Sequence, residues 1–130
     1  PRSIWEINRW GELVVLAQNA WLSGAVEDAR LAQRWLADWV ARNELAHGIN
    51  WTSALEAGLR LMQFTWIDQM LRSHADAEVR VEQERLAAKI VPGHAWWVWR
   101  HRSMGSSANN HLLGELAGLI LAARRWPSLV

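Results

Sequence analysis

The segment Asn109–Leu119 reads NNHLLGELAGL and joins two amides and an imidazole to an apolar run. Small polar residues lead into it, and leucines then recur at helical spacing from Leu112 onward. This pattern predicts a helix that has Asn110 as its N-cap and ends near Arg125. Backbone N–H groups at a helix start favour negative charge, so two amides and the imidazole of His111 could hold a carboxylate there.

Helical periodicity extends through the whole chain. Ser53-Ala54-Leu55-Glu56 has the pattern of a capping box, Asp76 is a second candidate N-cap, and Pro92-Gly93 is typical of a helix break. With Ser23-Gly24 as a further stop, the predicted helices cover about residues 4–22, 27–42, 53–72, 76–90, 94–102 and 110–125, with a polar loop at 43–50 and another at 103–109.

The apolar residues of each predicted helix lie on one face. In the last helix, Gly114, Gly118 and Ala122 are four residues apart, a spacing that lets another helix pack closely. The residues that share a face are Trp10, Leu13, Val14, Ala17 and Trp21; Ala32, Trp35, Leu36 and Trp39; Leu55, Leu59, Met62, Trp66 and Met70, which form a predicted inner face; and Leu112, Leu113, Leu116, Leu119, Ile120 and Ala123.

These patterns predict an all-α fold. The 130 residues suit one helical domain, and no run of alternating polar and apolar residues suggests a strand. Short connections favour antiparallel neighbours, so the helices should form successive αα-hairpins.

Composition narrows the function classes. The net charge is only +1, and basic residues alternate with acidic ones, as in Arg80–Arg85, so a one-sided nucleic-acid surface is not expected. Without Cys there are no disulfides or thiolate metal sites, and no apolar run approaches the roughly 18 residues of a membrane span. No cofactor or metal is expected, since His111 and Glu115 alone are a weak metal signature.

Three groups of residues have both a structural and a functional interpretation. Asn110 and His111 are either a cap and an exposed neighbour or donors to an anionic sugar. Asn50 and Trp51 are either a turn and a core residue or an amide and an indole lining a sugar cleft. Glu56 with Arg60, and His111 with Glu115, have the spacing of helix-surface pairs, the latter suited to an orienting contact.

Together these pieces resemble the helical N-terminal domain of the heparinase II/III-like polysaccharide lyases. The resemblance rests on the Trp5-Glu6…Arg9 opening, Gly-Ile-Asn-Trp at 48–51, Ser53…Glu56…Arg60 and the 109–119 run. It implies part of an incomplete (α/α) toroid, with residues 1–130 forming roughly its first half and a β-sandwich domain expected beyond them.

The resemblance also implies a function. Such enzymes cleave acidic polysaccharides, such as glycosaminoglycans or alginate, by β-elimination beside a uronic acid. Asn110 and His111 match the Asn-His pair that stabilises charge growing on the uronate carboxylate, and are therefore the expected catalytic residues. The substrate-binding residues are expected to be Asn50, Trp51, Arg60, Asn109 and Glu115.

One departure from the family is clear: the chain contains no Tyr, whereas a catalytic Tyr is typical. We therefore expect a fragment that recognises substrate but has no lyase turnover alone. The alternative is a non-catalytic helical carbohydrate-binding or scaffold module, and a nucleic-acid or partner-binding domain ranks last. Exposed helix faces suggest self-association, and the family suggests a periplasmic or secreted location.

Overall fold

The protein is all-α, as predicted. A computed structural model describes residues 2–106 and 108–130; Pro1, and Ser107 within the predicted 103–109 loop, lie outside this description. Within the described residues there is no strand and no helix long and apolar enough to cross a membrane. The elements are α1 Arg2–Ile7, α2 Gly11–Ser23, α3 Val26–Arg42, the 3₁₀ turn η1 Ile49–Trp51, α4 Ala54–Leu71, α5 Ala77–His101 and α6 Asn110–Arg125.

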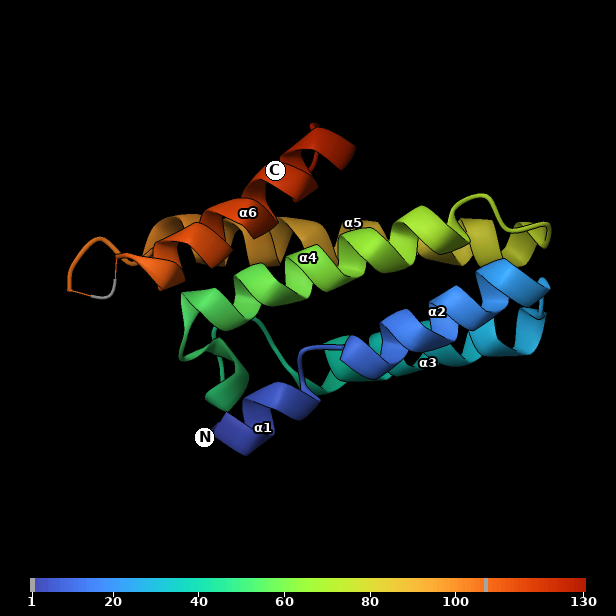
Figure 1. Cartoon of the computed structure of the whole chain (residues 1–130), viewed down its shortest axis with the longest axis horizontal. Coiled ribbons are helices and arrows are strands. Elements are labelled where there is room, and N and C mark those ends of the chain that lie inside the picture. The colour runs from blue at the N-terminus through green and yellow to red at the C-terminus, as the bar shows by residue number, and fades with distance from the viewer. Residues whose placement is uncertain (1, 107) are drawn as a thin grey trace.

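Two antiparallel hairpins form the body of the molecule (Figure 1). The α2–α3 hairpin packs against the α4–α5 hairpin, with α2 beside α4 and α3 beside α5, and α6 lies along α4. The short α1, η1, the start of α4, the end of α5 and the start of α6 all gather at one end of the molecule (Figure 1). Residues that are distant in sequence therefore share that end.

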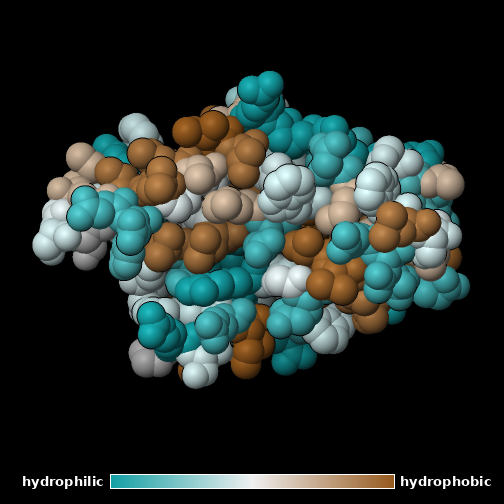
Figure 2. Space-filling view, in the orientation of Figure 1, coloured by the Kyte–Doolittle hydropathy of each residue, from teal (hydrophilic) through white to brown (hydrophobic). Residues whose placement is uncertain are grey.

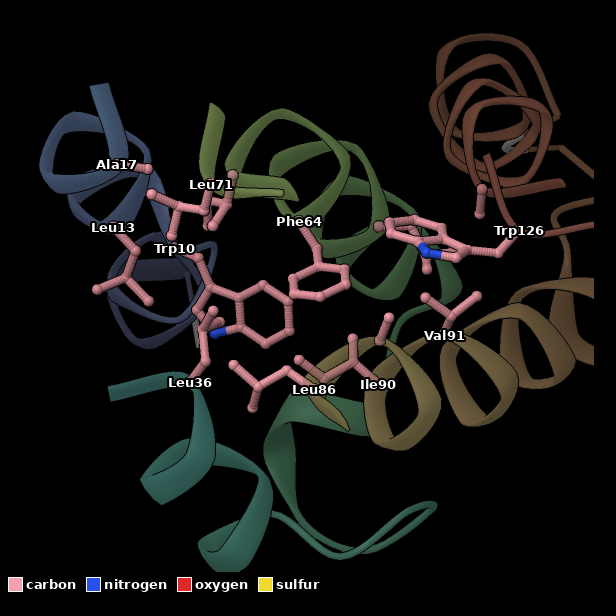
Figure 3. Close-up of a cluster of buried hydrophobic side chains, with 14 of the residues drawn as sticks. Trp10, Leu13, Ala17, Leu36, Phe64, Leu71, Leu86, Ile90, Val91 and Trp126 are labelled. Carbon is pink, nitrogen blue, oxygen red and sulfur yellow. The ribbon is translucent and has the colours of Figure 1, made fainter. Parts of the chain in front are cut away.

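The core is built around aromatic rings. Figure 3 shows Phe64 of α4 between Trp10 and Trp126, with Ile90 of α5 close by. Phe64 stacks on Trp126 at 5.4 Å between ring centroids and meets Trp10 edge-on at 6.5 Å. These contacts join α4 to both ends of the chain.

Trp10 also breaks the helix predicted over residues 4–22. It adopts a left-handed backbone conformation, with φ of 67°, between α1 and α2. That conformation costs about 1–2 kcal/mol, whereas burying roughly 200 Å² of Trp surface returns about 5 kcal/mol. Burial of this side chain, which is 3% exposed, therefore outweighs helix continuity.

The predicted inner face of α4 is wrong. Trp66 is 56% exposed, while Ala57, Leu61 and Phe64 are fully buried. The cause is that α4 contacts α2, α5 and α6, so several of its faces are covered and no single apolar stripe marks the interior. Trp21, Trp35, Leu113 and Ile120, which lie on the apolar faces predicted for the other helices, are likewise more than half exposed.

The predicted break at Pro92-Gly93 does not occur either, because α5 runs through it to His101, so that residues 94–102 are not a separate helix. Proline lacks the N–H that would bond to the carbonyl of Ala88. Ala88 is exposed, so water can reach that carbonyl. Buried residues on either side, Val91 and His94, keep the helix packed across the proline.

Small residues bring α4 and α6 into close contact, as the Gly114/Gly118 spacing predicted. A Cβ atom on Gly118 would lie 2.3 Å from the Gly58 carbonyl oxygen, and one on Gly58 would lie 2.9 Å from the Cα of Glu115. The two backbones touch at this point. Glycine at both positions is therefore required by the approach itself.

Candidate functional site

The start of α6 presents three exposed polar residues, Asn109, Asn110 and His111. The predicted cap is displaced by one residue: Asn110 is the first residue of the helix and Asn109 precedes it, without a capping hydrogen bond from its side chain. The two amides and the imidazole are thus directed to the surface within the first turn of a 16-residue helix. They remain the surface group that could contact a ligand.

Glu115 lies one turn further along but is only 1% exposed. Its carboxylate accepts hydrogen bonds from the backbone N–H and the hydroxyl of Ser103, both at 2.7 Å. The predicted orienting contact with His111 is therefore replaced by a contact with Ser103, two residues after the end of α5. Glu115 fastens the beginning of the loop that leads to Asn109, and it is too buried to touch a sugar in this structure.

Arg60 is the centre of a buried polar network. It is fully buried, its Nε donates to Nε2 of His94 at 3.0 Å, and Nη2 donates to the backbone carbonyl of Asn50 at 2.8 Å. Nδ1 of His94 lies 2.8 Å from the carbonyl of Ile90. The imidazole therefore donates from Nδ1 and accepts at Nε2, which is the neutral form.

Burial sets the protonation of this network. Desolvation lowers the pKa of Arg60 to about 9, against a smaller opposing effect of the Glu56 charge. Desolvation, and then the charge of Arg60, hold the pKa of His94 well below 6.5. The pair thus consists of a buried guanidinium and a neutral imidazole, and the interior position keeps both from a polymeric substrate.

Asn50 and Trp51 also face inward. The amide nitrogen of Asn50 donates to the side-chain oxygens of Asn43 and Asn8, at 2.7 and 3.2 Å. Trp51 is 4% exposed, and its ring centroid lies 4.7 Å from that of His94. Both members of this pair, which were predicted to line a sugar cleft, are thus covered by other residues in this structure.

The predicted surface pair of Glu56 and Arg60 is wrong. Glu56 is 2% exposed and receives two hydrogen bonds from the Arg9 guanidinium, at 2.6 and 2.7 Å. This contact raises the pKa of Arg9. The indole N–H of Trp5 donates to the carbonyl of Ile49 at 3.0 Å.

The sequence pieces that carry the family resemblance thus contact one another. Arg9 joins the chain after α1 to α4, Trp5 joins α1 to η1, Arg60 joins α4 to η1, and Gly58 joins α4 to α6. His94, which binds Arg60 in the buried network, is not among the residues that the sequence indicated. Its position four residues after Ile90, whose carbonyl it contacts, was the available signal.

Within the described ranges, no group of three or more His, Asp or Glu side chains is arranged to hold a metal ion. No protein-family model matches the chain, and comparisons with characterised proteins and with solved structures gave no match either.

Proposed function

We propose that the chain is the substrate-recognition portion of a polysaccharide lyase that cleaves uronic-acid polymers by β-elimination. The observation that carries this proposal is the exposed Asn109-Asn110-His111 group at the start of α6. Glu115 holds Ser103, where the preceding loop begins, and α6 itself is fixed to α4 by the Gly58–Gly118 contact. Donors on a well-anchored element are suited to a fixed anionic target.

The chemistry assigns each donor a role. Removing the proton beside a uronate carboxylate builds negative charge on that group, and donors already in place stabilise it. Asn110 and His111 would hold the carboxylate, and Asn109 would add a contact to a neighbouring sugar hydroxyl. A base and an acid are also required, and the chain has no Tyr to serve as either. Binding without turnover is therefore expected of these residues alone.

Binding measurements on the 130-residue chain test the proposal. Titration calorimetry with heparan sulfate and alginate oligosaccharides should show binding, whereas neutral dextran should show none. Asn110→Ala and His111→Ala should each weaken binding about tenfold, as expected for loss of one hydrogen bond to a charged group worth about 1.4 kcal/mol. Asn19→Ala, an exposed asparagine on α2, is the matched control and should bind as the parent does.

Two results would contradict the proposal: equal binding of dextran and uronate polymers, or unchanged binding by the Asn110→Ala/His111→Ala double variant. A rise in ultraviolet absorbance from unsaturated sugar ends would instead show that the chain cleaves the polymer unaided, contrary to the expected lack of turnover.

A second candidate is a non-catalytic carbohydrate-binding or scaffold module. It is favoured by the burial of Asn50, Trp51 and Arg60, which connect helices instead of lining a cleft. The two proposals differ in an active enzyme that contains this chain. A recognition half predicts that Asn110→Ala lowers kcat more than it raises KM, whereas a scaffold predicts an unchanged kcat.

A further inference from the structure

An apolar groove of about 600 Å³ lies between α5 and α6, on the side of α6 where its exposed residues are hydrophobic. Its lining includes Trp96 and Trp99, which are 53% and 59% exposed, and Ile120, which is 64% exposed. Figure 2 shows hydrophobic side chains gathered on the surface over α6. So much exposed apolar surface in one place indicates a binding surface.

The α5 wall has the spacing of a helix-packing seam. Pro92, Trp96 and Trp99 line the groove, and Lys89 extends the same row at its N-terminal end. These positions follow one another at three, four and three residues, which is the a/d repeat by which a helix presents one edge to a partner helix.

The α6 wall repeats this spacing. Leu116, Ile120 and Ala123 line the groove, and Leu113, which is 70% exposed, precedes them in the same row. Both walls of the groove thus present apolar residues at the spacing of a helix-packing seam. A third helix is the element that fits such a pair of rows.

The groove lining carries no charged side chain, and the exposed charges on the C-terminal part of α5 and on α6 are basic. Residues 86–130 contain five basic residues and a single acidic one, Glu115, which is buried against Ser103. Lys89, Arg100 and Arg124 are exposed. A helix that extends beyond the apolar lining therefore has cations, and no exposed carboxylate side chain, available to it from this part of the sequence.

We propose that the α5–α6 groove binds an amphipathic α-helix of a partner polypeptide whose flanks are acidic. A second copy paired face to face would bring two basic rims together, which opposes association. A bilayer surface is flat, whereas this surface is concave and suits a protruding ridge. Apolar side chains of the partner at a and d positions fill the groove, and its Glu or Asp residues meet Lys89, Arg100 and Arg124.

Two labelled peptides test the proposal by fluorescence anisotropy with the whole 130-residue chain. Each has three heptads with Leu at a and d; one carries Glu at e and g, and the other carries Lys there. The Glu peptide should bind at least about tenfold more tightly than the Lys peptide. Ile120→Glu and Trp96→Ala should each weaken its binding by about tenfold, whereas Val15→Glu, at an exposed position on α2, should not.

A charge reversal provides the second arm. Lys89→Glu combined with Arg124→Glu should favour the Lys peptide, and Arg34→Glu on α3 is the matched control, which should leave the original preference unchanged. Binding of neither peptide, or equal binding of both, would overturn the proposal. Sedimentation of the chain as a dimer that Ile120→Glu separates would assign the groove to a second copy, and Trp96-dependent binding of anionic vesicles would assign it to a membrane.

Discussion

Replacing Gly118 with alanine should destabilise the protein, although alanine is the better helix former. The new Cβ would lie 2.3 Å from the Gly58 carbonyl oxygen and 2.9 Å from the Gly58 Cα. Both are backbone atoms, so relief requires α6 to move away from α4 by about 1 Å. The higher helix propensity of alanine should stabilise the protein by about 1 kcal/mol, while overpacking of this kind should destabilise it by about 1–3 kcal/mol or more. Because this contact joins two backbones, we expect a net loss of about 2 kcal/mol.

Two other glycines provide controls of graded severity. A Cβ on Gly114 would meet only the flexible end of the Leu55 side chain, at 2.6 Å, and one on Gly11 would meet nothing within 4 Å. Gly114→Ala should therefore be close to neutral, and Gly11→Ala neutral or more stable by up to about 1 kcal/mol. Urea unfolding followed by circular dichroism measures all three. A Gly118→Ala variant as stable as the parent would refute the close backbone contact.

Three further predictions concern the buried polar groups. The low pKa of His94 keeps this imidazole unprotonated in the folded state, whereas in the unfolded state it gains a proton below about pH 6.5. As the pH is lowered from about 6.5 to 5, the free energy of unfolding should therefore fall by up to about 1.4 kcal/mol per pH unit. His94→Gln should flatten this slope in urea titrations, and an unchanged slope would contradict the role of His94. Arg9→Ala leaves the buried Glu56 carboxylate without its partner and should lower the free energy of unfolding by about 3 kcal/mol. Adding Glu56→Gln should recover part of this stability. Equal stability of the single and double variants would argue against a buried charge at Glu56. Glu115→Ala should lower the free energy of unfolding by about 2 kcal/mol and speed hydrogen exchange of the Ser103 amide. Unaltered exchange of that amide would show that Glu115 does not hold Ser103 in place.

Helix ends determined by local chemistry were predictable from the sequence. Asp76 caps α5 as expected, accepting from the backbone N–H groups of Glu78 and Val79, and Gly24 ends α2 in a left-handed conformation. Such signals involve neighbours within a few residues. The close packing of α6 was predictable for the same reason, since Gly118 has its effect wherever the partner helix comes from.

Features that depend on distant residues were not predictable. Ser53 makes no capping hydrogen bond to α4, and the carboxylate of Glu56, the other member of the proposed capping box, is held by Arg9, 47 residues earlier. The continuation of α5 through Pro92 depends on packing on both sides of the proline. The left-handed conformation of Trp10 depends on the room available for its ring in the core. None of these causes is visible in a short sequence window.

The candidate site separated into two groups for a related reason. Amides, an arginine and an indole are the residue types that line a sugar cleft, but the same types also satisfy one another inside a protein. Asn50, Trp51 and Arg60 are buried, whereas Asn110 and His111 are exposed. Sequence spacing identified the residues, but it could not say which of them face solvent.

The attachment of α1 has a consequence for where the molecule opens first. This helix has no buried residue, and the hydrogen bond from Trp5 to Ile49 links it to η1. Its detachment therefore exposes little apolar surface and needs far less free energy than global unfolding. A protease added at low concentration should cut within Arg2–Ile7 while the four long helices α3 to α6 stay intact.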